Sequence, residues 1–391
     1  MKVQTLKGFR DFLPKEARKR SYVLSTLKKV FESYGFEPLE TPALEYEEVL
    51  LGKYGDEGDK LMYRFEDNGK RRVALRYDQT VPLARVVAQY GNDLPLPFKR
   101  YQIQPVWRAE NTQKGRYREF LQVDVDTVGS YSPISDAEIV TIAVQSMLKL
   151  GFGEFKLFIN DRNIFEDMPK EYVTKIDKIN NIKNETEQDK AMKKFLDEIP
   201  EKYFYPFRTA ISTKEPTPKI NEILKLLDGG IKQYVSFNPG IARGLDYYTD
   251  MIFEVEAKGY LSGSIAGGGR YDKLIGMFSG KDIPAVGFAF GFDRLIEAME
   301  ELDLFPKDLG GTKILVTNVN PKTSEIADEL RKKGINTELY VDEKDLDKQL
   351  RYADRCGIPY VLIVDGKLTL KNMKSGEQSE VTLDQLPDVI R

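Results

Sequence analysis

The sequence predicts an α+β fold: an antiparallel sheet flanked by helices, with a small helical insertion and a C-terminal α/β domain. Three observations predict it. Runs within 101–128 and 251–295 either alternate polar and apolar residues or are continuously apolar, as strands do. Residues 162–232 are rich in Lys, Glu and Asn and have helical spacing. Beyond residue 312, strand and helix signals alternate, which favours parallel pairing.

The main domain begins with an amphipathic helix predicted over 15–33, and Gly35 is a plausible stop. An extended segment, 38–45, follows, and period-2 runs come after it. We expect 1–161 to form the first part of this domain. The helix is predicted from the spacing of Val23, Leu24, Leu27, Val30 and Phe31.

The remaining boundaries follow changes in composition. We expect 162–232 to be the helical insertion and 233–305 to complete the main domain. A Pro- and Gly-containing linker is expected at 306–312. The last domain, 313–391, is predicted to contain strands at 314–316, 339–341 and 360–364 and helices at 323–333 and 345–355.

The composition excludes several kinds of chemistry. The chain of 391 residues has no histidine, which rules out a His-based triad, general base or metal site. Its one cysteine, Cys356, excludes an internal disulfide and fits a reducing cytoplasm. No apolar run approaches a membrane span, so no membrane partner is expected. The net charge of −3 gives no global basic field for nucleic acid. Chemistry must therefore depend on carboxylates, arginines, hydroxyls and oxygen-bound hard cations.

Two consecutive strands, 101–110 and 121–128, predict a polar floor with a cationic rim. Alternate residues of a strand share a face. The loop between the strands carries three cations. A sheet with one solvated face is the competing interpretation, and the commoner one for a single strand. The shared faces carry Gln102, Gln104, Val106, Arg108 and Glu110 on the first strand and Gln122, Asp124 and Asp126 on the second.

Two further segments supply polar groups. Arg76, Asp78 and Thr80 share a face if 75–82 is extended. A strand end followed by a helix with Thr80 as N-cap is the favoured alternative for this segment alone. Residues 267–269 are three glycines, predicted to form a turn after a strand at 263–266. Such a turn either lets the backbone approach a ligand or closes an ordinary hairpin.

Two segments carry cations in unusual places. Residues 285–295 are predicted to be a buried strand entering a helix, with Arg294 in the first turn. A cation there opposes the helix dipole, and phosphate is one candidate for the reason. In 242–250, Arg243 stands beside Tyr247 and Tyr248 before a strand at 251–256, so a fixed cation lies next to two phenols.

In this order the segments resemble the histidyl-tRNA synthetase family of class II aminoacyl-tRNA synthetases. The likeness covers nearly the whole chain outside 162–232. Motifs 2 and 3 alone indicate only the class, whereas the two histidine signatures together are specific. The matching segments are 8–14, 40–42 (motif 1), 108–120 (motif 2), 287–294 (motif 3) and the signatures 243–248 and 268–272.

The resemblance implies a divided catalytic domain (1–161 and 233–305) and a C-terminal anticodon-binding domain. It implies L-histidine, ATP with Mg²⁺ and tRNA(His) as ligands, with the Mg²⁺ accompanying ATP rather than held in a protein-only cage. It also implies a homodimer formed through motif 1 and a cytoplasmic location.

The resemblance also assigns residues. Arg108 and Arg243 are placed at the α-phosphate as the catalytic pair. Arg116 and Arg294 are placed at the β/γ end of ATP, and Glu110 at its adenine end. The implied histidine contacts are Asp78, Thr80 and Gln122 for the α-amino group, Asp126 and Tyr248 for the imidazole, and Arg243, Tyr247 and Tyr271 close by.

Two questions stay open at this level. A catalytically inactive paralogue that regulates ATP phosphoribosyltransferase shares this sheet, but it typically lacks the motif 2 and motif 3 arginines and the anticodon-binding domain. Chance similarity in an unrelated sheet protein is a third alternative. Asp250 stands where relatives carry small residues, so it is expected either to face solvent or to alter the pocket.

Overall fold

The computed structural model describes residues 2–112, 115–180, 182, 184–243, 247–318, 323–342 and 345–390, apart from the side chains of 55–57, 170 and 185. The chain forms two compact units, one ending at Phe305 and the other beginning at Pro306. Within the described residues, no helix combines the length and the apolar character needed to cross a membrane.

The first unit is built on an eight-stranded sheet with the order β1-β5-β6-β11-β10-β9-β7-β8. The inner pairs are antiparallel, and the two outermost pairs are parallel. The strands are β1 (Glu37–Pro38), β5 (Phe98–Trp107), β6 (Glu119–Val128), β7 (Phe155–Asp161), β8 (Val235–Phe237), β9 (Met251–Ala257), β10 (Ala266–Arg270) and β11 (Ala285–Gly291).

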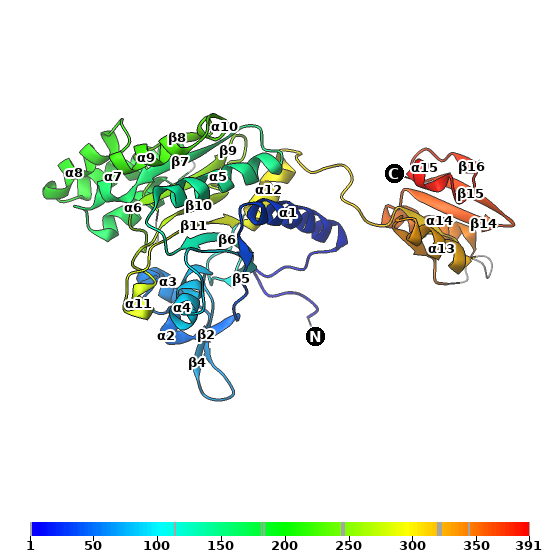
Figure 1. Cartoon of the computed structure of the whole chain (residues 1–391), viewed down its shortest axis with the longest axis horizontal. Helices are drawn as coiled ribbons and strands as arrows, with labels where there is room; N and C mark the ends of the chain where they lie inside the picture. The colour runs from blue at the N-terminus through cyan, green and yellow to red at the C-terminus, as the bar shows by residue number, and fades with distance from the viewer. Residues whose placement is uncertain are drawn as a thin grey trace. The chain divides into compact units, whose positions relative to one another are not determined.

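Helices cover one face of this sheet, as Figure 1 shows for α1 (Pro14–Ser33), α5 (Pro133–Lys149) and α12 (Phe292–Glu301). The apolar residues of the strands pack against the buried faces of these helices; Val123, Val125 and Phe253 are fully buried there. Because strand residues alternate between faces, the polar residues of β5 and β6 point to the opposite side. That side is the floor of the site described below.

A second, three-stranded sheet lies beside the first and contains β2 (Leu44–Tyr46), β4 (Arg72–Leu75) and β3 (Arg64–Glu66) in that order. The short helices α2 (Glu47–Leu50), α3 (Gly55–Lys60) and α11 (Gly276–Ser279) and the longer α4 (Thr80–Tyr90) complete this region. The suggestion that Thr80 caps α4 is wrong. Thr80 is the first helical residue, and the carboxylate of Asp78 accepts from the backbone N–H of Val81 at 3.1 Å.

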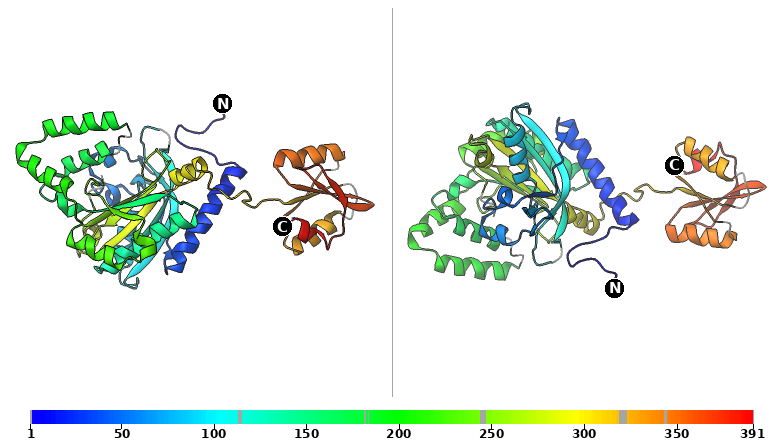
Figure 2. Two further views of the ribbon diagram at one scale, coloured as in Figure 1. Left: turned by 90° about the horizontal axis from the view of Figure 1, so that it is seen from above. Right: turned by 90° about the horizontal axis from the view of Figure 1, so that it is seen from below.

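The segment 162–232 is helical. The 3₁₀ turn η1 (Arg162–Phe165) is followed by α6 (Lys170–Asn180), α7 (Glu185–Glu198) and α8 (Glu201–Ser212), which share a core of their own. Both views in Figure 2 place these green helices across the unit from the blue helix α1. The last two helices, α9 (Pro218–Leu226) and α10 (Gly229–Lys232), pack instead against the main core through Ile220, Ile223 and Ile231.

The glycines 267–269 do not form the turn that the sequence predicted. They lie inside β10, which pairs with β9 on one side and β11 on the other. A Cβ at Gly268 would lie 2.2 Å from the carbonyl oxygen of Gly287, and one at Gly269 would lie 2.4 Å from that of Met251. The strand therefore needs glycine because its neighbours approach too closely for side chains, a reason the local sequence does not show. The predicted strand at 263–266 is correct only at its last residue.

The second unit is an α/β fold, as predicted. Parallel strands β13, β12 and β14 continue into antiparallel β15 and β16. Its elements are β12 (Ile314–Val316), α13 (Thr323–Lys332), β13 (Thr337–Leu339), α14 (Leu346–Cys356), β14 (Tyr360–Asp365), β15 (Lys367–Asn372), β16 (Gln378–Glu380) and α15 (Leu386–Ile390).

Candidate active site

A cavity of about 1290 Å³ opens on the polar face of the large sheet. Every residue that the sequence assigned to the site lines it, although these residues come from segments far apart in the chain. They are Asp78, Thr80, Arg108, Glu110, Arg116, Gln122, Asp126, Arg243, Tyr247, Tyr248, Tyr271 and Arg294. The polar face of β6 is therefore not solvated surface but part of the cavity floor. The predicted contribution of β5 is wrong: Gln102 and Gln104 are not among the described lining residues, and both form hydrogen bonds with Thr41 instead.

The floor is centred on Asp126, which is buried on β6. Its cross-strand partner on β5 is Arg100, whose Nη2 lies 2.8 Å from Asp126 Oδ2. Tyr271 donates a hydrogen bond from Oη to Asp126 Oδ1 at 2.5 Å. Burial raises the pKa of Asp126, and the charge of Arg100 and the Tyr271 hydrogen bond oppose this rise. The carboxylate is thus held by one hydrogen bond, from Tyr271, and by one ion pair, with Arg100.

Gly287 makes room for Asp126. It pairs with Asp126 across the β11–β6 ladder, and a Cβ at this position would lie 1.9 Å from Asp126 Oδ1. Because no side chain can share that space, glycine is required for the carboxylate to lie along the floor.

Two buried acceptors belong to residues that line the cavity, one on Asp78 in the opposite wall and one on Gln122 in the floor strand β6. Tyr54 donates to Asp78 Oδ1 at 2.8 Å, and burial raises the pKa of the Asp78 carboxyl. In the described part of the chain, Asp78 Oδ2 and Gln122 Oε1 are buried without a hydrogen-bond partner. Buried polar atoms are normally paired, so these two oxygens are suited to a ligand with N–H donors.

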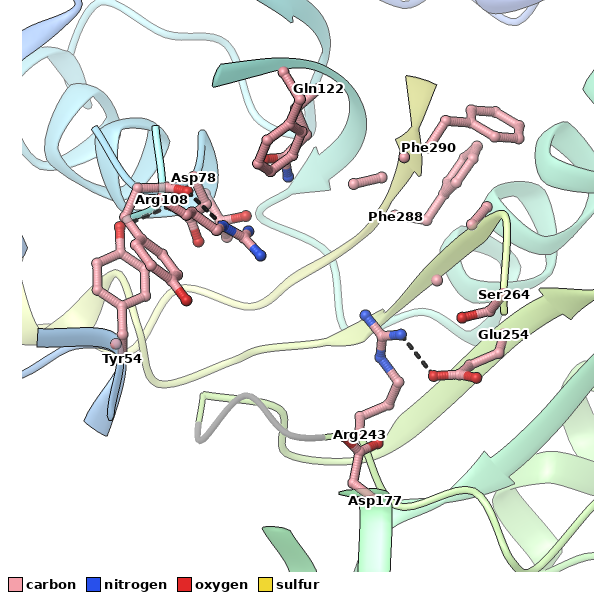
Figure 3. Close-up of a pocket in the computed structure, with 18 of the residues that line it drawn as sticks. Tyr54, Asp78, Arg108, Gln122, Asp177, Arg243, Glu254, Ser264, Phe288 and Phe290 are labelled. Carbon is pink, nitrogen blue, oxygen red and sulfur yellow. Dashed lines mark hydrogen bonds and ion pairs between the residues drawn. The ribbon is translucent and has the colours of Figure 1, made fainter. Parts of the chain in front are cut away.

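Arg243 lies on the far side of the cavity, where its Nη1 contacts Glu254 Oε1 at 2.7 Å (Figure 3). Its backbone has a φ of +51°, which is unusual for a residue with a side chain. The guanidinium crosses β10 at Gly267, where a Cβ would lie 2.3 Å from Nη1. The signature residues Gly244, Leu245 and Asp246 lie outside the described residues.

Arg108 stands near Asp78 in Figure 3, opposite Arg243. Its Nε donates to the carbonyl oxygen of Tyr77 at 3.1 Å, and its guanidinium lies 4.4 Å from the centre of the Tyr77 ring. Glu110 Oε1 is 4.0 Å from Arg108 Nη1. Among the described residues, only the Nε of the Arg108 guanidinium donates a hydrogen bond to the protein, so its terminal nitrogens can bind a ligand.

Arg294 occupies the first turn of α12, as the sequence predicted. Its Nη1 donates to the carbonyl oxygen of Ser264 at 3.1 Å. Burial and the nearby positive charge of Arg116 both lower its pKa. Two guanidinium groups that repel each other at the edge of a cavity form a site that an anion stabilises. Gln113 and Lys114, predicted in the same loop, lie outside the described residues.

Sequence reasoning missed four residues of this constellation. Arg100 continues the alternation of Gln102 and Gln104, so the pattern of β5 itself could have indicated it. Glu254 is one of two charged residues, with Glu256, in a strand whose other residues are apolar, which is also a usable signal. Tyr54 and Asp177 approach the cavity from α3's N-terminal flank and from α6, and no local pattern indicates either.

Two expectations resolve differently. Arg76 does not join Asp78 at the cavity, because its guanidinium donates to the carbonyl oxygens of Thr41 and Pro105 at 2.7 and 2.8 Å. Burial lowers its pKa to about 10. Asp250 is half-buried and is not among the described residues that line the cavity: it contacts the Asn163 amide, and its Oδ1 lies 2.7 Å from Lys219 Nζ.

Comparisons with known proteins show the family to which the chain belongs. Residues 8–202 and 213–295 match the family model described as histidyl-tRNA synthetase. The chain belongs to the histidyl-tRNA synthetase family. The predicted family and fold class are therefore confirmed. Residues 311–391 match a second model, the anticodon-binding domain.

Individual members of the histidyl-tRNA synthetase family cover the chain almost completely. The histidine–tRNA ligase of Phocaeicola vulgatus is 38% identical and aligns with 98% of each chain. That of Aeropyrum pernix is 40% identical, over 97% of this chain and 95% of the relative. The crystal structure of histidyl-tRNA synthetase from Nostoc sp. superposes with a TM-score of 0.82 at 28% identity, covering 100% of this chain and 99% of that one.

A solved structure described as an ATP phosphoribosyltransferase regulatory subunit/histidyl-tRNA synthetase, from Bacillus halodurans, has a TM-score of 0.71 at 21% identity. At that identity the likeness concerns the fold alone. The anticodon-binding domain favours a synthetase of the histidyl-tRNA synthetase family over the regulator.

Proposed function

We propose that this cavity activates L-histidine with ATP and transfers it to the 3′ end of tRNA(His), as a histidine–tRNA ligase of class II. One observation carries the proposal. Arg108, Arg243 and Arg294, from three distant segments, line the same cavity as Gln122 and Asp126. Two anions, a carboxylate and a polyphosphate, can meet there only if cations from different parts of the chain converge.

The first step is an in-line attack of the histidine carboxylate on the α-phosphate of ATP. A P–O bond to the new acyl group forms, the α–β bridging bond breaks, and pyrophosphate leaves. The nucleophile is already ionised near neutral pH, so no general base is needed, and a chain without histidine can perform the step. The protein contributes alignment and neutralisation of charge.

Four arginines divide this task. Arg108 and Arg243 contact the α-phosphate from opposite sides of the cavity and stabilise the charge that develops there. Arg116 and Arg294 hold the β- and γ-phosphates, and their mutual repulsion is relieved by the bound anion. Glu110, next to Arg108, contacts the adenine end of the nucleotide.

The histidine substrate is held on the floor and the Asp78 wall. The unpaired oxygens of Asp78 and Gln122, together with Thr80, accept the N–H groups of the α-ammonium. Asp126 and Tyr248 bind the two imidazole nitrogens, with Tyr247 and Tyr271 against the ring. An amino acid without ring nitrogens would leave these buried groups unpaired, which is the basis of strong rejection.

In the second step the terminal ribose hydroxyl of tRNA attacks the carbonyl carbon of the adenylate, and AMP leaves. A phosphate oxygen of the adenylate accepts the hydroxyl proton. The C-terminal α/β unit binds the anticodon region of tRNA(His).

Mg²⁺ enters with ATP. The carboxylates on the cavity wall near the arginines, Glu110 and Glu254, suit an ion held mainly by phosphate oxygens and water. When bound, the ion neutralises charge on the phosphates. Within the described residues no cluster of three acidic or sulfur ligands offers a protein-only cage.

The protein acts as a homodimer in the cytoplasm. Support for the dimer is the motif 1 likeness at 40–42 and the adjoining three-stranded sheet, whose Leu44, Tyr46 and Phe65 are 42%, 52% and 43% exposed. Exposed large apolar residues gathered on one sheet are typical of protein interfaces. Sedimentation equilibrium should give twice the mass of one chain.

Purified protein with Mg²⁺ and ATP should exchange labelled pyrophosphate into ATP only when histidine is present, and should then charge tRNA(His). Absence of exchange together with tight histidine binding would support the regulatory paralogue instead. If the protein catalyses pyrophosphate exchange but does not attach histidine to tRNA(His), the adenylation step is supported and the transfer step is refuted.

A further inference from the structure

The backbone of Arg243 is held from behind the cavity by Arg162, the first residue of η1. One nitrogen, Arg162 Nη1, donates to the carbonyl oxygens of Ala242 at 2.6 Å and of Arg243 at 3.0 Å. A single guanidinium thus fixes two successive peptide groups, immediately where the chain adopts a φ of +51°. A left-handed conformation at a residue with a Cβ persists only where its surroundings hold it.

Arg162 is itself firmly anchored. Its backbone N–H donates to the carbonyl oxygen of Asp250 at 2.8 Å. The preceding carboxylate, Asp161, accepts from the N–H of Asn163 at 3.0 Å and from Thr217 Oγ1 at 2.8 Å. The turn η1 is therefore a fixed support at the end of β7, and the Arg162 side chain extends from it toward the 242–243 peptide groups.

The insertion supplies the matching acceptor. Asp177 on α6 accepts a hydrogen bond from the backbone N–H of Arg243, and Figure 3 shows it beside that residue. Burial raises the pKa of Asp177, and the positive charges of Arg243 and Arg162 lower it, so all three groups are close together. Asn180, one turn further along α6, donates to the carbonyl oxygen of Gly240 at 2.5 Å.

Arg162 is not among the described residues that line the cavity, so it has no direct path to a substrate. Its two hydrogen bonds to the 242–243 carbonyl oxygens connect it to Arg243, which does line the cavity. We propose that Arg162 is a positioning residue for the activation step: it fixes the 242–243 peptide groups so that the Arg243 guanidinium crosses β10 at Gly267 and reaches the reacting carboxylate and phosphate. This inference depends on the role proposed above for Arg243.

The test measures the rate constant and the Michaelis constants of histidine-dependent pyrophosphate exchange separately. Arg162→Ala should lower kcat about 10- to 100-fold and change KM for ATP and histidine by less than about threefold, because a charged group displaced by about 1 Å loses mainly transition-state stabilisation. Arg162→Lys, which keeps a cationic donor, should recover part of kcat. Asn163→Ala is the matched control: it alters the same turn but leaves the 242–243 carbonyls bonded, and kcat should stay within about twofold.

A double variant decides whether Arg162 acts through Arg243. Adding Arg162→Ala to Arg243→Ala should cause no further loss of kcat, since the group being positioned is already absent. Losses that multiply in the double variant, or an equal loss in Asn163→Ala, would overturn the inference. If Arg162→Ala fails to fold, Arg162→Lys replaces it in the same comparison. Arg162→Lys alone should have a lower kcat than wild type, and Arg162→Lys combined with Arg243→Ala should have the same kcat as Arg243→Ala alone.

The two proposals fail in distinguishable ways. A wild-type kcat for Arg243→Ala would refute the role of Arg243 itself. If Arg243→Ala has a reduced kcat but Arg162→Ala has the kcat of wild type, the role of Arg243 is supported and only its positioning by Arg162 is refuted.

Discussion

Tyr271 Oη lies 2.5 Å from Asp126 Oδ1, and this hydrogen bond joins the second histidine signature to the floor strand β6. Burial and the adjacent carboxylate raise the pKa of Tyr271 well above its ordinary value, so the phenol stays protonated and remains a donor. With Arg100 on the other carboxylate oxygen, Asp126 is oriented before any ligand arrives.

Removing this donor should weaken histidine binding. Tyr271→Phe is expected to raise KM for histidine about tenfold, because a hydrogen bond to a charged group contributes about 1.5–3 kcal/mol. KM for ATP should be unchanged. Tyr101→Phe is the matched control, since it removes a tyrosine–carboxylate hydrogen bond to Glu32 of 2.9 Å on the other face of β5. An equal change in both variants would mean that the Tyr271 effect is one of fold stability.

Arg243→Ala should reduce kcat of pyrophosphate exchange about 10²- to 10³-fold, the range typical for loss of one preorganised charge-stabilising group. The dissociation constant of ATP, measured by calorimetry, should change far less. Arg85→Ala serves as control, because Arg85 pairs with Glu45 at 2.8 Å and is not among the described residues that line the cavity. Equal losses in catalysis and in ATP binding would contradict a transition-state role for Arg243.

Gly287→Ala should damage histidine binding selectively. The new methyl group would lie 1.9 Å from Asp126 Oδ1, far inside van der Waals contact, and would displace the carboxylate. We expect the histidine dissociation constant to rise about 10- to 100-fold, consistent with the typical penalty for overpacking. Gly153→Ala is the control, since a Cβ there meets nothing within 4 Å. Unchanged histidine affinity in Gly287→Ala would show that Asp126 does not contact the ligand.

The buried carboxyl groups should make the free energy of unfolding depend on pH. Burial raises the pKa of Asp124 well above its ordinary value, although the charge of Arg100 lowers it. An Asp whose pKa is raised in the folded state stabilises the fold below about 3.9, and this contribution is lost as pH rises through the raised value. The unfolding free energy of Asp124→Asn should therefore increase relative to wild type as pH rises from about 4 to 7.

Asp67 provides a control of opposite sign for this experiment. Hydrogen bonds from Arg71 lower the pKa of Asp67, so its carboxylate stabilises the fold at neutral pH and loses that effect in acid. Asp67→Asn should become less stable relative to wild type as pH rises. Denaturant unfolding at several pH values measures both differences, and a flat profile for Asp124→Asn would contradict the raised pKa.

The polar floor was predictable because strand geometry is simple. Once β5 and β6 are strands, period-2 alternation places Gln122, Asp124 and Asp126 on one face, and they do lie there. Extending the same alternation back to Arg100 would have found the cation opposite Asp126. These residues are fixed by local rules that need no knowledge of the rest of the molecule.

The parts that could not be predicted depend on distant neighbours. The composition of residues 267–269 suggests a turn, but these glycines lie in strand β10. Glycine is needed there because Gly287, Phe288 and the Arg243 guanidinium lie too close for a side chain. Asp177 and Arg162 acquire their relation to Arg243 only when α6 and η1 pack beside the 238–243 loop. Such contacts between segments leave no periodic pattern in the sequence.

Beside Asp126, part of the cavity floor is bare backbone, because Gly267 and Gly287 have no side chain that a substitution could shorten. Redesign toward a larger amino acid therefore cannot gain space from below. It would have to reshape the phenol side, at Tyr247, Tyr248 and Tyr271, where atoms are present to remove. Because the glycine positions cannot be made smaller, a change of specificity toward a larger amino acid depends on shortening the tyrosines.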